Sequence, residues 1–126
     1  MEVTCATSFD ERFDPNDVLS SAPNKFWLTT GMYPQELTIT FNQARVINEV
    51  SFLTSGVKKA QIQGCQTVNG NNFSVIGESK ELQGGRGQMQ QQESIRIGKP
   101  SSYIMIKFVI LEGWEDFASV HNLEIQ

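Results

Sequence analysis

The chain is short of charge, histidine and cysteine, and each shortage argues against a class of protein. Charged residues make up only 19% of the 126 residues, and the net charge is −4. An acidic chain repels phosphate backbones, so we do not expect nucleic acid as a partner. The two cysteines, Cys5 and Cys65, are far apart and neither has a second metal ligand beside it. The spacing typical of a zinc site is therefore missing.

Long apolar runs are also missing. Nothing approaches the roughly 18 consecutive apolar residues of a membrane-spanning helix. The N-terminus lacks the basic start and apolar core of a secretory signal peptide. We therefore expect no membrane insertion and no secretory route, which favours reduced thiols over a disulfide.

Motifs for catalysis are absent as well. The sequence contains neither a Gly-x-Ser-x-Gly elbow nor a P-loop. Gly85-Arg86-Gly87 begins a dinucleotide pattern but lacks its third glycine. The single histidine, His121, has no serine or cysteine motif around it, and we interpret it as structural. An enzyme that uses His121 with an acidic neighbour is the weakest hypothesis, so we predict that the protein is not an enzyme.

What the chain does contain is alternation of apolar and polar residues. Leu37, Ile39 and Phe41 share one parity and Thr38 and Thr40 the other, which is typical of a half-buried strand. Further segments of this kind recur about every ten residues, and together they predict eight or nine strands in a single domain over residues 1–126. These segments are 45–53, 58–65, 73–78, 94–97, 103–111 and 119–125. The class is all-β, either a sandwich or a barrel.

Two segments depart from the strand pattern. Asp14-Pro15 begins one helical turn ending at Leu19, with Asp14 as its cap. Leu82 to Gln92 contains three glycines in four residues, and we interpret it as a mobile loop. The Asn69-Gly70 pair predicts a tight hairpin turn before the strand at 73–78.

Aromatic residues gather in two turns. Phe26 to Pro34 carries three aromatics and a methionine, and Gly113 to Phe117 is a second turn of this kind. We expect Trp27 to be buried, and Met32 and Tyr33, with the second aromatic turn, to form an exposed apolar surface of the kind found at protein interfaces. The predicted interface residues are Thr30, Met32, Tyr33, Glu115, Asp116, Phe117 and Ser119. The alternative is that these residues brace the sandwich and a partner docks on a sheet face.

The same two segments carry a family resemblance. Phe26-Trp27-Leu28-Thr29-Thr30-Gly31-Met32-Tyr33-Pro34-Gln35-Glu36 resembles the hallmark stretch of the intraflagellar transport complex B subunit twenty-five family, also catalogued as beta-class small heat-shock proteins. Phe117-Ala118-Ser119-Val120-His121 resembles the C-terminal signature of that family. Ala6-Thr7-Ser8 followed by Asp10-Glu11 resembles its first strand exit.

The resemblance implies a fold and a role. The fold would be a discoidin-like, galactose-binding-type jelly-roll β-sandwich. The role would be that of a ciliary adaptor that forms a heterodimer with a Rab-like small GTPase subunit and contacts other complex B subunits. That dimer would work in the cytoplasm and the cilium or flagellum, where it would support export of receptors and other cargo.

One feature of the family is altered here. Members of the family often hold a calcium ion through an acid and a threonine shortly before the tryptophan. Here Ser20 and Lys25 stand at these positions, and an ammonium group repels a cation. We expect this calcium site to be lost or weakened. Other carboxylates could supply oxygen ligands, but we interpret them as solvated: Asp10, Glu11, Asp14, Asp17, Glu112, Glu115 and Asp116.

The same fold leaves a rival hypothesis open, a module that binds carbohydrate or a lipid headgroup. Sugar sites pair an aromatic platform with polar donors on loops. Phe9, Arg12 and Phe13, with Trp114, could form such a site. A fold alone does not transfer a function, so this stays the alternative.

Overall fold

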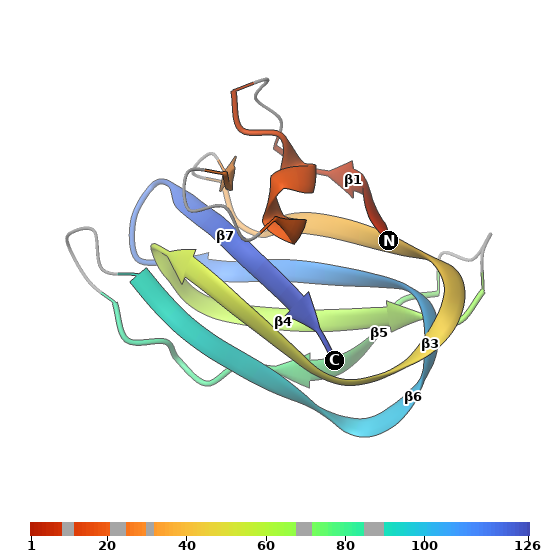
Figure 1. The fold of residues 1–126 in the computed structure, drawn as a ribbon. Helices are drawn as coiled ribbons and strands as arrows, with labels where there is room; N and C mark the ends of the chain where they lie inside the picture. Colours follow the sequence, from red (N-terminus) through yellow and green to blue (C-terminus); the bar gives the residue numbers. More distant parts are fainter. Residues whose placement is uncertain (9–11, 21–24, 30–31, 68–71, 85–89) are drawn as a thin grey trace.

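A computed structural model describes residues 1–8, 12–20, 25–29, 32–67, 72–84 and 90–126. Within these ranges the chain forms seven strands and one short 3-10 helix (Figure 1). The strands are β1 (Glu2–Ala6), β2 (Trp27–Thr29), β3 (Gln35–Ser55), β4 (Val57–Cys65), β5 (Ser74–Glu78), β6 (Gln90–Gly113) and β7 (Ala118–Ile125), and the helix is η1 (Pro15–Leu19). Among the described helices, none has the length and apolar character that crossing a bilayer requires.

Two long strands build both layers of the molecule. β3 and β6 pair antiparallel along most of their length, and both curve round at the same side of the fold (Figure 1). Before its bend, β3 pairs with β1 and with the second half of β6, which continues to β4 and β5. After its bend, β3 pairs with β7 and the first half of β6, and β7 pairs with β2. The result is one continuous antiparallel sheet folded over itself into a two-layer sandwich.

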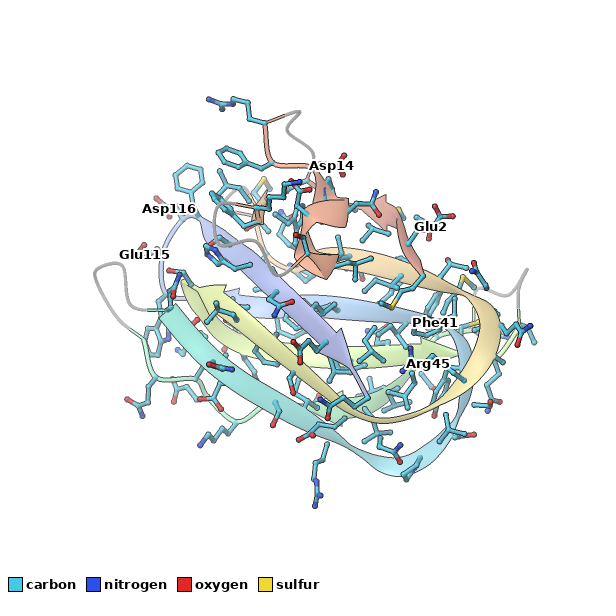
Figure 2. The ribbon with its side chains drawn as sticks, viewed as in Figure 1. Glu2, Asp14, Phe41, Arg45, Glu115 and Asp116 are labelled. Atoms are coloured by element: carbon cyan, nitrogen blue, oxygen red, sulfur yellow. The ribbon has the colours of Figure 1, made fainter. Side chains whose placement is uncertain are left out.

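The bend of β3 explains why the predicted number of strands was wrong. The β3–β6 ladder is interrupted between Thr40 and Arg45. Phe41 remains buried there, with the Arg45 guanidinium 5.4 Å from its ring centroid (Figure 2). Arg45 also donates a hydrogen bond of 3.0 Å to the backbone oxygen of Ile125. Because the chain bends without ending the strand, segments expected as separate strands are halves of β3 and of β6.

The core lies between the two layers. Leu37, Ile39 and Phe41 all point inward, as their alternation predicts, and Ile106 and Phe108 meet them from β6. Trp27 is fully buried, and its indole nitrogen donates to the backbone oxygen of Ser8 at 2.9 Å. The predicted burial of Trp27 is therefore confirmed.

The predicted helical turn is confirmed too. The Asp14 side chain accepts a hydrogen bond from the Asn16 backbone nitrogen at 2.9 Å, and Pro15 occupies the first turn. The capping carboxylate satisfies one of the amide groups that the start of a helix leaves free.

The predicted loop from Leu82 to Gln92 is confirmed at residues 82–84, which lie outside the strands, and is wrong at its C-terminal end. Leu82 is buried in the core, and its backbone nitrogen donates a hydrogen bond of 2.8 Å to the backbone oxygen of Lys58. β6 already begins at Gln90, and the Gln91 side chain is buried. A buried apolar side chain and a hydrogen-bonded amide anchor Leu82, and residues 85–89 lie outside the described chain.

The hairpin between β4 and β5 is confirmed, because the two strands pair antiparallel. Asn69 and Gly70, on which the prediction of a tight turn rests, lie outside the described residues. The connection spans residues 66–73, which is longer than a two-residue turn.

Both cysteines are free, Cys5 exposed and Cys65 buried.

Candidate protein-binding surface

Two connections that are distant in sequence meet at one end of the sandwich. Tyr33, between β2 and β3, donates its hydroxyl to the backbone oxygen of Glu115 at 2.9 Å. Its ring also lies against Gly113, where any side chain would collide with it. The β2–β3 connection is thereby fixed to the β6–β7 turn, which Figure 1 shows projecting from the end of the molecule.

The apolar side chains at this end are unusually exposed. Met32 is 81% exposed, Phe117 58% and Trp114 39%. These residues and the half-buried Tyr33 lie on the two joined connections, and we call them together the turn patch. Exposed large apolar side chains that cluster beside polar residues are typical of protein interaction sites.

Hydrogen bonds to backbone oxygens and a contact with a lysine hold Trp114 of the turn patch in place. The Trp114 indole nitrogen donates to the Leu82 oxygen at 3.0 Å, and its backbone nitrogen donates to the Gly56 oxygen at 2.9 Å. The Lys58 ammonium lies 4.9 Å from the Trp114 ring centroid. The β6–β7 turn is therefore anchored to two other connections, so its exposed side chains are presented on a fixed scaffold.

Two carboxylates border the turn patch. Glu115 and Asp116 are both exposed and project at the same end of the molecule (Figure 2). Burial raises the pKa of the Tyr33 phenol above its ordinary value, a hydrogen bond with the Thr29 side chain opposes this, and the charges of Asp116 and Glu115 add to the rise. Tyr33 is therefore a neutral hydrogen-bond donor at any ordinary pH.

The structure places most of the predicted interface residues together. Met32, Tyr33, Glu115, Asp116 and Phe117 all lie at this end, whereas Thr30 lies outside the described residues. Ser119 differs from them, because it is only 8% exposed, in β7. Its hydroxyl contacts the His121 Nε2 at 2.8 Å, so in the free chain Ser119 offers little surface to a partner.

The sequence interpretation left Trp114 and Lys58 out of the predicted interface. Trp114 was recognised in the second aromatic turn but assigned to the rival sugar site. Two glycines were the available signal. The Tyr33 ring packs on Gly113, and the Trp114 ring packs on Gly84. Nothing in the local sequence of Lys58 shows that it lies on Trp114.

Comparison with known proteins identifies the family. No family model matches the chain. A human protein, intraflagellar transport protein 25 homolog, is 31% identical over 125 residues, which cover 99% of this chain and 85% of the relative. The chain belongs to the intraflagellar transport protein 25 family. The resemblance found from sequence is thereby confirmed.

Other relatives agree with this assignment. The mouse homolog of intraflagellar transport protein 25 is 30% identical over 125 residues, covering 99% of this chain and 85% of its own length. The Chlamydomonas reinhardtii intraflagellar transport protein 25 is 29% identical over 123 residues. Those residues are 98% of this chain, which spans only 63% of the length of the algal protein.

Solved structures show that this family member has the galactose-binding-like jelly-roll fold. A Clostridium perfringens family 32 carbohydrate-binding module in complex with galactose has a TM-score of 0.78 at 19% identity, covering 98% of this chain and 92% of the module. Chitosan-binding module 1 of a Paenibacillus enzyme has a TM-score of 0.83 at 13% identity, covering 100% and 96%. At such identities the likeness shows the fold alone, and it confirms the expected jelly-roll sandwich.

His121, in β7, is half-buried. Its ring lies 4.8 Å from that of Phe26, and its Nε2 contacts Ser119. The Nδ1 atom is buried and has no hydrogen-bond partner among the described residues. Burial lowers the pKa of His121 below its ordinary value, so the ring is neutral near pH 7. The Ser119 contact alone does not make a nucleophile, since a reacting group also needs an orienting acid and an oxyanion site.

Of the residues expected in the rival sugar site, the structure brings Arg12 and Phe13 together and places Trp114 in other contacts. Phe13 stacks on Phe26 at 4.6 Å, with Arg12 over the Phe13 ring at 5.5 Å. Trp114 instead contacts Lys58 and Leu82. Phe9 lies outside the described residues.

The position where the resemblance implies a calcium site is described only at its borders. Ser20 and Lys25 are described and Lys25 is exposed, whereas residues 21–24 between them are not. Of the other carboxylates, Asp14 is occupied in capping η1, and Asp10 and Glu11 lie outside the described ranges. Where the chain is described, no three potential metal ligands gather.

Proposed function

We propose that this chain is a non-enzymatic adaptor subunit of intraflagellar transport complex B. It forms a heterodimer with a Rab-like small GTPase subunit and supports export of cargo and receptors from the cilium. The observation that carries the proposal is the match to intraflagellar transport protein 25 relatives over nearly the whole chain. The protein works in the cytoplasm and in the cilium or flagellum, together with other complex B subunits.

The turn patch supports a binding role and is the surface that we assign to the partner. Met32 and Phe117 are exposed on a scaffold that Tyr33 and Trp114 hold in place. A turn that is held in place before binding loses little backbone entropy in the complex, and large apolar side chains contribute most to interface energetics.

Co-expression with the Rab-like subunit of the same organism, followed by size-exclusion chromatography, tests the proposal. We expect a stable one-to-one complex with an interface of about 1,600 Å² or more. Two separate peaks, with no complex at micromolar concentration, would contradict the adaptor role.

Substitutions then test the surface. Met32→Asp and Phe117→Asp should leave the chain folded, since both side chains are exposed, and should weaken the complex by at least about tenfold, because each would bury an unpaired charge. Tyr33→Ala added to Met32→Asp should weaken it further, but this change also removes the hydrogen bond to Glu115 and loosens the turn.

Val46→Asp is the matched control. Val46 is 53% exposed, similar to Phe117, but lies at the bend of β3. It should leave the affinity unchanged. Equal loss in all three variants, or no loss in Met32→Asp and Phe117→Asp, would assign the partner to another face of the sandwich.

A further inference from the structure

A polar cleft lies at the opposite end of the sandwich from the turn patch. It has a volume of about 280 Å³ and is lined by Gly64, Gln66, Thr67, Asn72, Ser74 and Tyr103. These residues come from the end of β4, the β4–β5 connection, the start of β5, and β6. Figure 1 shows the end of β4 and the β6–β7 turn on opposite sides of the molecule.

The floor of the cleft is aromatic. Gly64 and Tyr103 are its two buried lining residues, and the Tyr103 side chain is 7% exposed. A Cβ atom on Gly64 would lie 2.6 Å from the Tyr103 ring, so only glycine allows the ring to take this position. The ring therefore sits directly on the backbone of β4, beneath the polar rim.

The rim presents hydrogen-bonding groups that the chain itself does not use. Within the described residues, the polar side-chain atoms of Asn72, Ser74 and Tyr103 make no hydrogen bond. Gln66 donates to the Ser101 hydroxyl at 3.0 Å, which fixes its amide at the edge of the cleft. Two hydroxyls and an amide thus remain available at one small site, where a ligand could exchange hydrogen bonds with them.

The described residues that line the cleft carry no charge. All six lining residues are neutral at ordinary pH, which disfavours a phosphate or carboxylate as the bound group. A sugar ring combines an apolar C–H face with a circle of hydroxyls, which complements an aromatic floor and a neutral polar rim.

We propose that this cleft binds a neutral polyol of monosaccharide size. The ring of the ligand lies over Tyr103, and its hydroxyls exchange hydrogen bonds with Asn72, Ser74 and the Tyr103 hydroxyl. The site is separate from the turn patch and from the residues Arg12, Phe13 and Trp114. The proposal does not depend on the adaptor role.

Titration of the ¹⁵N-labelled chain, followed through its backbone amide signals, tests the proposal. The probes are methyl β-D-galactoside, N-acetyl-D-glucosamine and myo-inositol, with glycerol as the control for weak unspecific contact. We expect at least one of the three to give saturating shifts at Gly64, Gln66, Thr67 and Ser74. A response to myo-inositol alone would identify the ligand as an inositol headgroup, and a response to the hexoses would identify it as a glycan.

Tyr103→Phe is the decisive variant. It removes one hydroxyl that has no partner in the described chain, so the fold should be unaffected while the dissociation constant rises about tenfold. Ser74→Ala should act in the same direction, and because Ser74 is exposed it is safe for folding. Tyr33→Phe, at the other end, should leave the titration unchanged.

Two results would overturn the proposal. One is the absence of saturating shifts at the cleft with all three probes. The other is unchanged affinity in both Tyr103→Phe and Ser74→Ala, since binding would then not use the unpartnered hydroxyls.

Discussion

The two tryptophans have different roles, and we expect their substitution to lower the free energy of unfolding by different amounts. Trp27 is fully buried and hydrogen-bonded to Ser8, whereas Trp114 is 39% exposed in the turn patch. Trp27→Ala leaves a large cavity and should cost about 3–5 kcal/mol of unfolding free energy. Trp114→Ala loses one hydrogen bond and the Lys58 contact, about 1–2 kcal/mol. Urea denaturation of both variants measures the difference, and equal losses would be inconsistent with these roles.

His121 should make stability depend on pH. Its pKa is lowered in the folded state, so the unfolded chain binds a proton more readily. Stability is then complete above the ordinary histidine pKa of about 6.5 and falls as pH decreases from there toward the lowered folded value.

The comparison with His121→Gln isolates this contribution. Denaturation midpoints of the native chain should decrease more than those of the variant between about pH 7 and pH 5, a window set by the ordinary histidine pKa. The contributions of the carboxylates to stability are shared by both proteins and cancel in the difference. Parallel curves would show that His121 does not contribute to the pH dependence.

Among the elements, the β3–β4 turn depends most directly on one residue. Gly56 has φ +78°, and a Cβ there would lie 2.6 Å from the Phe117 backbone oxygen. Gly56→Ala should therefore cost at least about 1–2 kcal/mol and displace the β6–β7 turn. Thermal or urea unfolding measures the loss.

Gly98→Ala is the control for that substitution. A Cβ at Gly98 meets nothing within 4 Å, so this change should be neutral or stabilise the protein by about 0.4–1 kcal/mol. If Gly56→Ala were as stable as Gly98→Ala, the turn would not require a left-handed residue.

The strands that alternation predicts are those whose inner face was recognisable locally. Leu37, Ile39 and Phe41 fixed the register of β3 because every second residue had to be buried. The bends were not predictable, since nothing local shows that Thr40 and Arg45 belong to one strand. The burial of Leu82 and Gln91 could not be predicted for the same reason. Gln91 bonds Thr54 at 3.1 Å, Val57 at 2.6 Å and Gln83 at 2.9 Å, contacts mostly distant in sequence.

The candidate interface was predictable only in part. The aromatic turns were visible from composition, because glycine and proline interrupt them. That the two turns touch follows from the register of β3 against β6, which pairs Gln35 with Ile110 and brings Tyr33 to Gly113. Register of this kind is set by the whole sheet rather than by a motif, and the polar cleft around Tyr103 arises in the same way.

At the scale of the whole molecule, the sandwich separates its two candidate sites. The turn patch begins at the end of β6, where Tyr33 packs on Gly113, and the cleft lies at Tyr103, about 33 Å away along an extended strand. The two sites share no residue, so we expect that occupation of one does not change the affinity of the other.

That independence can be tested through stability without any ligand. Met32→Asp and Tyr103→Phe share no partners, so their effects on unfolding free energy should add to within about 0.5 kcal/mol in the double variant. Met32→Asp with Tyr33→Phe is the matched pair within one site, where Tyr33 holds the Glu115 turn and a coupling is expected. Non-additivity of the first pair as large as that of the second would mean that the two ends communicate through the sheet, and that partner binding could regulate the cleft.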